Sequence, residues 1–351
     1  MRANLNRRDF TASLLAAATL PHAAFAQATP ITRRFGVFSL FHPQQLLIQS
    51  TQPTLLHLNN TLHMVPPQSS AIRIQITPNH RLTITFNNST HTADTLRITN
   101  PSGEATTFTL TVPPPSLHGT IQRQYTATLD LYATEAALQP ILTMDIETAT
   151  ASIVLAESPA HAPAPYLQAQ AIISRSFLLS ATTGHRNFDF CDTTHCQFLR
   201  EAPPPNSPAA IATTQTTSQH LTYEGQILPA MYSRSCGGHT HTLAELGLPT
   251  HAYPYYSVSC QPCLQHPERW HSTITPDTQL PTNERTRLAL TRIQGWSALP
   301  SNTFSRTSNN IEGVGLGHGI GLCQRGAVSM AIQGIDHPTI LAHYYPNTIL
   351  S

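Results

Sequence analysis

Apolar and polar residues alternate along several short segments in the first third of the chain. Residues 72–76 and 82–86 each carry an apolar side chain at every second position, which predicts two half-buried β-strands. Pro78-Asn79-His80 between them is typical of a turn. Residues 107–112 repeat the alternation and are followed by three prolines. We therefore expect a β-rich domain over residues 35–115.

Further along the chain the pattern changes from strand to helix. After another alternating segment at 125–132, residues 166–181 place Leu167, Ile172, Ile173 and Phe177 on one stripe of a helix. Pro165 stands in its first turn, where a missing N–H is tolerated. A second helix is expected over 323–333. The sequence thus predicts an α+β fold, with a mixed α+β domain over residues 116–351.

The first 26 residues have the pattern of an export signal. Arg7-Arg8 is followed by a short apolar stretch and by Ala24-Phe25-Ala26, a small-x-small cleavage pattern. The apolar stretch is shorter than the roughly 20 residues that a bilayer-spanning helix needs. We expect a twin-arginine-type signal peptide over residues 1–26, export to the periplasm or cell envelope, and no transmembrane segment in the mature chain.

The composition excludes several classes of function. Charged residues make up 11% of the chain, the formal net charge is +1, and all 19 basic residues are arginines. A lysine-free chain has no P-loop lysine and no Schiff-base lysine. A nearly neutral chain also lacks the basic surface of a nucleic-acid-binding protein.

Few carboxylates remain as candidates for acid–base chemistry, and Glu157 is distinctive among them. It directly follows the apolar run 153–156. Burial beside such a run raises the pKa of a carboxyl group, which lets it act as a general acid. The alternative is an ordinary helix-capping or exposed glutamate.

Cysteine and histidine residues gather in one short segment. Cys191, His195 and Cys196 offer two thiolates and an imidazole within six residues, and zinc prefers such ligands. A fourth ligand could come from Cys260 and Cys263, from Cys236, or from water. The alternative is disulfide bonding, which an exported protein permits.

Two further segments combine glycine with polar side chains. Cys236 lies beside Gly237-Gly238 and His239, and it could form a nucleophilic pair with His239 or His318; a turn with a structural cysteine is the preferred interpretation. Glycine alternates with larger residues over 313–321. If this segment were extended, one of its faces would carry no side chains and could approach a sugar or another chain.

Together, these segments resemble the SpoIID/LytB family, named for a sporulation-stage cell-wall enzyme and an amidase-modifier protein. Residues 167–177 look like the family's LKAQAVAARTY helix, 188–197 like FDLCDTTHCQ, 232–240 like YHSSCGGHT, and 317–327 like GHGVGMSQYGA. The chain departs from the last of these motifs at Cys323, where the family has serine, and at Arg325, where it has tyrosine.

This resemblance implies a lytic transglycosylase that acts on peptidoglycan glycan strands. It implies Glu157 as the catalytic acid and base, Glu147 as the counterpart of a second family acid, and Cys191, His195 and Cys196 as ligands of a structural zinc. Positions implied to contact the glycan are Arg175, Tyr232, His239, His318 and Gln324.

Two other functions stay open on the sequence. A non-catalytic glycan-binding module could enhance or localise a cell-wall amidase, which would then be the partner protein. A zinc or cysteine hydrolase could use Cys191, His195 and Cys196, or Cys236.

Overall fold

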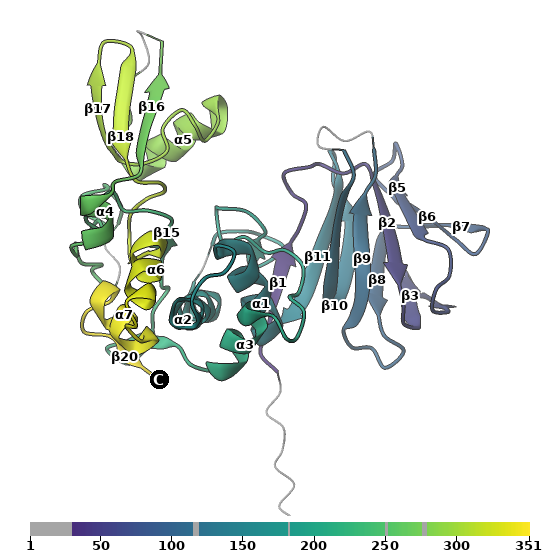
Figure 1. Ribbon diagram of the computed structural model, residues 1–351. Helices are drawn as coiled ribbons and strands as arrows, with labels where there is room; N and C mark the ends of the chain where they lie inside the picture. The colour runs from purple at the N-terminus through teal and green to yellow at the C-terminus, as the bar shows by residue number, and fades with distance from the viewer. Residues whose placement is uncertain (1–29, 115–118, 182, 250–251, 276–278) are drawn as a thin grey trace, which may run out of the picture. The chain divides into compact units, whose positions relative to one another are not determined.

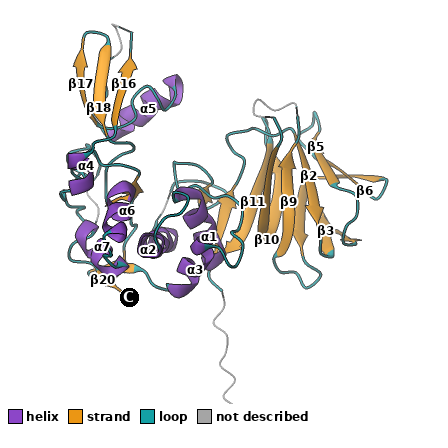
Figure 2. Cartoon of the chain, in the orientation of Figure 1, coloured by secondary structure: helices purple, strands orange, loops and turns teal. Residues whose placement is uncertain are grey.

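The computed structural model describes residues 30–114, 119–181, 183–249, 252–275 and 279–351. The predicted signal peptide, residues 1–26, lies outside the described residues. Within them, strands dominate the first part of the chain and helices and short strands alternate in the rest, so the α+β prediction is confirmed (Figures 1 and 2).

A twelve-stranded sheet makes up the first part of the described chain. Its main path runs β12-β1-β11-β10-β9-β2-β5-β6-β7, while β8 joins at β10 and carries β3 and then β4. The strands are β1 (Thr32–Gly36), β2 (Gln45–Ser50), β3 (Thr54–Leu58), β4 (Thr61–Val65), β5 (Ile72–Ile76), β6 (Leu82–Phe86), β7 (Ser89–Ala93), β8 (Thr95–Thr99), β9 (Thr106–Val112), β10 (Ile121–Ala133), β11 (Leu138–Asp145) and β12 (Phe190–Cys191).

The long strand β10 connects two parts of this sheet. Its first half pairs with β9, and its second half pairs with β11 on one side and β8 on the other. Alternate apolar residues of these strands, including Ile74, Ile84, Phe108 and Leu129, fill the first hydrophobic core. The strands predicted at 72–76 and 82–86 are confirmed as β5 and β6. The division of the chain at 115/116 stays a prediction, and the strands before and after it share one sheet.

Helices follow the sheet, and all of them except α5 contribute residues to a second core, whereas Leu290 of α5 packs against a small third one. They are α1 (Ile146–Glu157), α2 (Ala164–Ser180), α3 (Pro208–Gln215), α4 (Gln261–Gln265), α5 (Glu284–Gln294), α6 (Gln324–Ile332) and α7 (His337–Tyr344). Eleven of the 17 residues of α2 are buried, and α2 packs against α1, α3, α6 and α7. The predicted helices at 166–181 and 323–333 correspond to α2 and α6, whereas α1 was not foreseen.

Three small sheets complete the described structure. They pair β13 (Leu221–Tyr223) with β14 (Gln226–Ile227) and β20 (Ile349–Leu350), β15 (Tyr232–Ser233) with β19 (Leu322–Cys323), and β18 (Asn310–Val314) with β16 (Arg269–Thr273) and β17 (Thr303–Thr307). The parallel β15–β19 pair matters most here, because it joins the segment of Tyr232 to the start of α6.

The glycine-rich segment is not an extended strand. Beyond β18, Gly315, Gly317, Gly319 and Gly321 have φ values of 85°, 95°, 75° and 69°. Left-handed backbone at alternate positions bends the chain repeatedly, and glycine adopts it without a steric penalty. The segment is therefore a folded loop that leads into β19.

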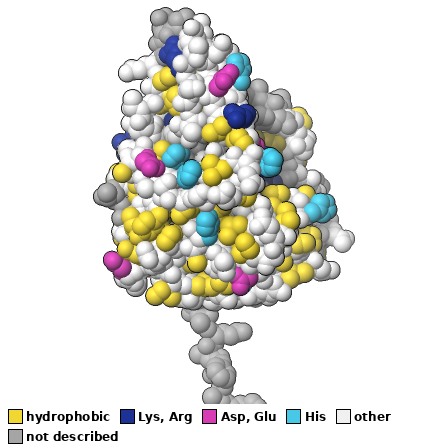
Figure 3. Space-filling model, turned by 60° about the vertical axis from the view of Figure 1, so that its left-hand side comes forward, with side chains coloured by type: hydrophobic (Ala, Val, Ile, Leu, Met, Phe, Trp, Pro, Cys, Tyr) yellow, Lys and Arg dark blue, Asp and Glu magenta, His cyan; other side chains and the backbone are white. Residues whose placement is uncertain are grey.

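The surface carries few charges, as the composition predicts. On the face shown in Figure 3, isolated arginine and acidic side chains lie among histidine, uncharged polar and apolar side chains. No helix among the described residues is both long and apolar enough to span a membrane.

Candidate functional site

Glu157 is the last residue of α1, at the edge of the second core. Asp145 caps the start of this helix by accepting hydrogen bonds from the N–H groups of Glu147 and Thr148. The apolar run that drew attention to Glu157 in the sequence is the last turn of α1, and Ile153 and Val154 are fully buried. Glu157 itself is half-buried.

The Glu157 side chain meets groups from three distant segments. One carboxyl oxygen, Oε1, accepts a 2.8 Å hydrogen bond from the backbone N–H of Phe198. The carboxyl group also bonds to the side chains of Tyr232 and Gln324. Gln324 Nε2 further donates to the Glu157 backbone carbonyl at 3.2 Å and to Gln170 Oε1 at 3.4 Å.

Burial sets the protonation state of this carboxyl. It raises the pKa of Glu157, and the hydrogen bonds from Phe198 and Tyr232 offset part of that rise because they stabilise the charged form. Arg200 acts in the same direction as these hydrogen bonds, and its guanidinium stacks on the Phe198 ring at 4.6 Å. The result is a carboxyl that holds its proton more tightly than an exposed glutamate.

Tyr232 can serve both protonation states of Glu157. Its hydroxyl lies 3.1 Å from Gln197 Oε1, and Gln197 is oriented by donating from Nε2 to the Ser174 carbonyl at 3.4 Å. A tyrosine hydroxyl has one proton and can also accept. It can therefore donate to Gln197 while accepting from protonated Glu157, and turn its proton to Glu157 when that carboxyl is ionised.

Four of the five residues expected to contact a glycan divide into three groups. Tyr232 and Gln324 contact Glu157 directly. His318 is one step away, because it bonds to the Tyr232 backbone and its Nδ1 accepts from the Ile320 N–H at 3.0 Å. His239 is exposed and pairs through its backbone with Ser259, next to Cys260.

Arg175 has a structural environment, in contrast to the expectation of glycan contact. It is 1% exposed, and its Nε and Nη2 donate to the two carboxylate oxygens of Glu147 at 2.8 and 2.6 Å. It also donates to the Gln219 and Thr213 carbonyls. These bonds occupy the guanidinium inside the α1–α2–α3 packing, so Arg175 stabilises the fold there and does not present its charge to a ligand.

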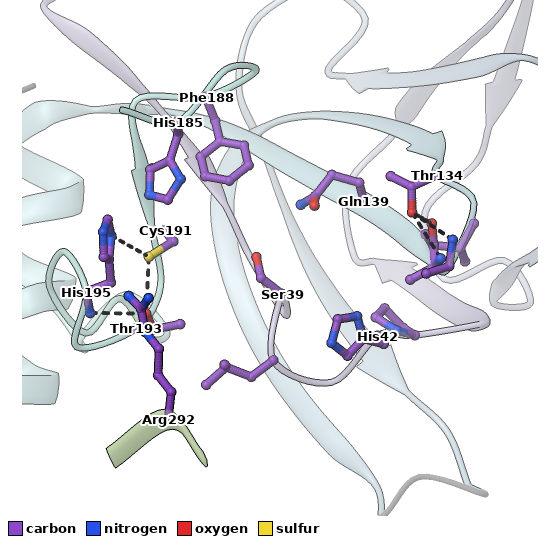
Figure 4. A pocket seen from close by; sticks show the side chains of 15 residues that line it. Ser39, His42, Thr134, Gln139, His185, Phe188, Cys191, Thr193, His195 and Arg292 are labelled. Carbon is purple, nitrogen blue, oxygen red and sulfur yellow. Dashed lines mark hydrogen bonds between the residues drawn. The ribbon is translucent and has the colours of Figure 1, made fainter. Parts of the chain in front are cut away.

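The predicted metal ligands converge, and the structure adds a fourth residue. The ligand atoms of His185, Cys191, His195 and Cys196 all lie within 4.8 Å of one another; we call them cluster A. Cys191 Sγ lies 3.6 Å from Cys196 Sγ, and His185 Nε2 lies 3.4 Å from Cys196 Sγ. Figure 4 shows His185 and His195 beside Cys191, at the wall of a cavity of about 520 Å³.

His185 is a candidate ligand that the sequence interpretation missed. It stands six residues before Cys191, between the end of α2 and β12, and this closeness in the sequence is the signal that could have suggested it. Two thiolates and two imidazoles form a complete tetrahedral donor set for zinc. The other cysteines named as possible fourth ligands, Cys236, Cys260 and Cys263, instead lie together with Cys323 in a second group.

Cluster A is tied to the sheet on one side and to Glu157 on the other. Cys191 belongs to β12, which pairs with β1. The next residue, Asp192, is buried and accepts hydrogen bonds from Arg123 Nη1 at 2.7 Å and from the Phe38 N–H at 3.1 Å. Directly after Cys196 come Gln197 and Phe198, the partners of Tyr232 and Glu157. A metal at cluster A would thus hold the backbone that bonds the candidate acid.

The fold and site define an α+β protein with a partly buried carboxyl, a Cys/His cluster and a second group of four cysteines. Residues 134–223 match the SpoIID family, described as stage II sporulation protein, and this match assigns the segment to that family. It contains Glu147, Glu157, Arg175 and cluster A. The SpoIID domain indicates a role connected with the cell wall or sporulation.

One relative extends the similarity beyond that segment. An uncharacterized protein of Brachyspira hyodysenteriae is 26% identical over 243 residues. The alignment spans 58% of this chain and 65% of the relative, so the chain covers less than two thirds of that protein's length.

Proposed function

We propose that this protein is an exported lytic transglycosylase that cleaves the β-1,4 bond between N-acetylmuramic acid and N-acetylglucosamine in peptidoglycan glycan strands, with Glu157 as general acid and base. One observation carries this proposal: the Glu157 carboxyl is partly desolvated and contacts Tyr232, Gln324 and the Phe198 N–H. Burial favours the protonated form of this carboxyl and the surrounding donors stabilise its anion, and these are the two states between which a general acid and base alternates.

The chemistry needs a single carboxyl group. Protonated Glu157 would give its proton to the glycosidic oxygen as the bond from that oxygen to C1 of N-acetylmuramic acid breaks. The C6 hydroxyl of the same sugar would then attack C1, and the Glu157 carboxylate would take the hydroxyl proton. The product is a 1,6-anhydro ring, water is not consumed, and Glu157 returns to its protonated form. Glycosidases that use water or a covalent intermediate need a second carboxylate.

Tyr232 and Gln324 would position the acid. Tyr232 can accept from the protonated carboxyl and donate to the ionised one, which suits a group that alternates between the two states. Gln324 bonds both the carboxyl group and the backbone of Glu157 and so orients the end of α1.

Zinc at cluster A would have a structural role. The donor set fits the ion, since His185, Cys191, His195 and Cys196 supply four ligands of the types that structural zinc sites use. A set complete with protein ligands leaves no position for a reactive water. The ion would therefore fix the loop that delivers Gln197 and Phe198, which favours the transglycosylase over a zinc hydrolase.

The decisive experiment is mass spectrometry of the products from purified glycan strands, with peptides and without. The wild-type protein is expected to release fragments that end in a 1,6-anhydro ring. Glu157→Gln is expected to lower this release at least about 100-fold, the usual contribution of a general acid. Glu201→Gln is the matched control, because Glu201 is exposed and should leave the rate unchanged.

Other outcomes would assign a different function. Equal release by wild type and Glu157→Gln would remove Glu157 from the mechanism. No release by either protein, together with co-sedimentation of both with glycan strands, would indicate a binding module that enhances or localises a cell-wall amidase.

A further inference from the structure

Four cysteines from three separate segments meet in the second core. The sulfurs of Cys236, Cys260, Cys263 and Cys323 all lie within 4.8 Å of one another, and each residue is 4% exposed or less. We call this group cluster B. It is distinct from cluster A and uses all the cysteines that cluster A does not.

The spacing of the sulfurs fits one shared metal ion. Cys263 Sγ and Cys323 Sγ are 3.6 Å apart. Zinc–sulfur bonds of about 2.3 Å in a tetrahedron place neighbouring sulfurs about 3.8 Å apart. Disulfides would instead draw the sulfurs into two pairs of about 2 Å each. A four-iron cluster would have to fit between the sulfurs and hold them farther apart.

The backbone around cluster B donates to sulfur, as it does around metal-bound thiolates. Cys323 Sγ accepts from the N–H groups of Cys236 at 3.3 Å and Gly326 at 3.4 Å. Gly326 has no space for a side chain, since an added Cβ would lie 2.5 Å from Cys260 Sγ. Donors directed at a sulfur stabilise its anionic form, and the anion is the form that binds a metal.

Local sequence supports the same assignment. Cys260-Gln-Pro-Cys263 has the two-residue spacing by which one short turn offers two thiolates to a zinc ion, and here it forms the first turn of α4. Cys323 stands where the resembled SpoIID/LytB motif has serine. This departure has a structural explanation, because Cys323 supplies the fourth sulfur.

We propose that cluster B is a second structural zinc site, with Cys236, Cys260, Cys263 and Cys323 as its four ligands. The ion would hold Cys236, which follows β15, and the first turn of α4 against the N-terminus of α6. Tyr232 lies four residues before Cys236, and Gln324 directly follows Cys323. The two clusters would thus each hold part of the surroundings of Glu157: cluster A holds Gln197 and Phe198, and cluster B holds Tyr232 and Gln324.

Metal analysis of the purified full chain tests this site independently of enzymatic activity. Two equivalents of zinc per chain are expected for the wild type. Cys260→Ser combined with Cys263→Ser should remove one equivalent, and the matched control, Cys191→Ser combined with Cys196→Ser, should remove the other. A wild-type content of one equivalent that the first double variant leaves unchanged would overturn the proposal.

Measurements on the wild type decide the question even where a variant fails to fold. After replacement of zinc by cobalt, the two sites differ in the number of thiolates, four against two. The thiolate-to-cobalt charge-transfer absorption should therefore exceed what a single two-thiolate site produces, by about threefold if both sites fill. Absorption of one two-thiolate site alone, or iron in place of zinc, contradicts the assignment.

Peptide mapping supplies the third readout. Alkylation of the denatured, chelator-treated but unreduced protein should label Cys236, Cys260, Cys263 and Cys323. If these cysteines are instead recovered as disulfide-linked peptides, cluster B is a pair of disulfides and the zinc proposal is wrong.

Discussion

Glu157 Oε1 accepts its 2.8 Å hydrogen bond from the backbone N–H of Phe198, which stands only two residues after Cys196 of cluster A. The candidate acid and the candidate metal cluster are therefore coupled through two peptide units. Neither Glu157 nor Cys196 is near the other in the sequence, so this coupling arises from the fold.

The coupling predicts what loss of a metal at cluster A would do. His185→Ala removes one of four ligands and should lower zinc content by one equivalent and loosen the loop that carries Phe198. Even mutation of a group that only supports a metal ligand typically costs about 10- to 100-fold in metal affinity or activity. We expect release of anhydro fragments to fall by a similar factor.

The control for this variant is His271→Ala, because His271 is exposed and lies in β16. Zinc content by elemental analysis and the fragment assay should match wild type for the control. Unchanged zinc in His185→Ala would remove His185 from the ligand set.

Glu157 should make stability depend on pH. Because burial raises its pKa, the folded protein keeps the proton at pH values where the unfolded chain has released it. The resulting stabilisation is complete below the ordinary glutamate pKa of about 4.3 and is lost as pH rises through the raised value. The side chain of the Glu157→Gln variant cannot ionise. The Tm of this variant should therefore rise relative to that of the wild type as the pH is increased from 4 to 8.

Thermal unfolding of wild type, Glu157→Gln and the exposed control Glu201→Gln at several pH values measures this effect. A Tm difference between wild type and Glu157→Gln that stays constant with pH would show that Glu157 titrates as an ordinary glutamate.

His318 should make the protein less stable as the pH falls, which is the opposite of the effect expected for Glu157. Burial lowers its pKa to about 4, so the folded protein keeps the ring neutral. Unfolded histidine binds a proton at about pH 6.5. Stability is therefore expected to fall as pH drops from about 6.5 to about 4, by a total of roughly 3 kcal/mol.

His318→Asn tests this expectation, because the asparagine Oδ1 can replace Nδ1 as the acceptor for the Ile320 N–H. Urea unfolding at pH 7 and pH 5 should show a smaller stability loss for the variant than for wild type. An equal loss in both proteins would assign the acid sensitivity to other groups.

The ion pair of Arg175 and Glu147 predicts a stability effect without a substrate effect. Arg175→Met leaves the partly buried Glu147 carboxylate without its partner, which should cost about 3 kcal/mol. The exposed Arg186→Met should change the free energy of unfolding by less than about 0.5 kcal/mol.

A measurement of glycan affinity distinguishes a structural role of Arg175 from a role in glycan contact. Folded Arg175→Met is expected to co-sediment with glycan strands as wild type does. A selective loss of binding with little loss of stability would instead restore Arg175 as a glycan-contacting residue.

Local sequence patterns predicted several of the strands and helices that the structure shows. The alternation at 72–76 and 82–86 gives β5 and β6, since a strand with one buried face needs an apolar residue at every second position. The stripe that starts near Pro165 gives α2. The helix α1 was missed because its buried face includes Ala149, Thr150 and Ser152, so apolar residues alone do not mark a stripe along it.

The sequence predicted some residues of the candidate site correctly and others not, because local patterns do not report how the helices pack. Tyr232, Gln324 and Glu157 were candidates from the sequence, and the fold brings them into contact. Arg175 was a candidate of the same kind, but its burial against Glu147 depends on how α1 and α2 pack, which its neighbours in the chain do not reveal.

The sequence by itself determined the strand and helix pattern, the acid at the end of an apolar run, and the cysteine-histidine chemistry available to the chain. These are properties of neighbouring residues, and periodicity and composition report them. Only the tertiary structure decided how the six cysteines divide into clusters A and B and that His185 completes the first of them. Cys236, Cys260 and Cys323 are separated by long stretches of chain, and their convergence depends on the parallel pairing of β15 with β19 and on the packing of α4 against α6.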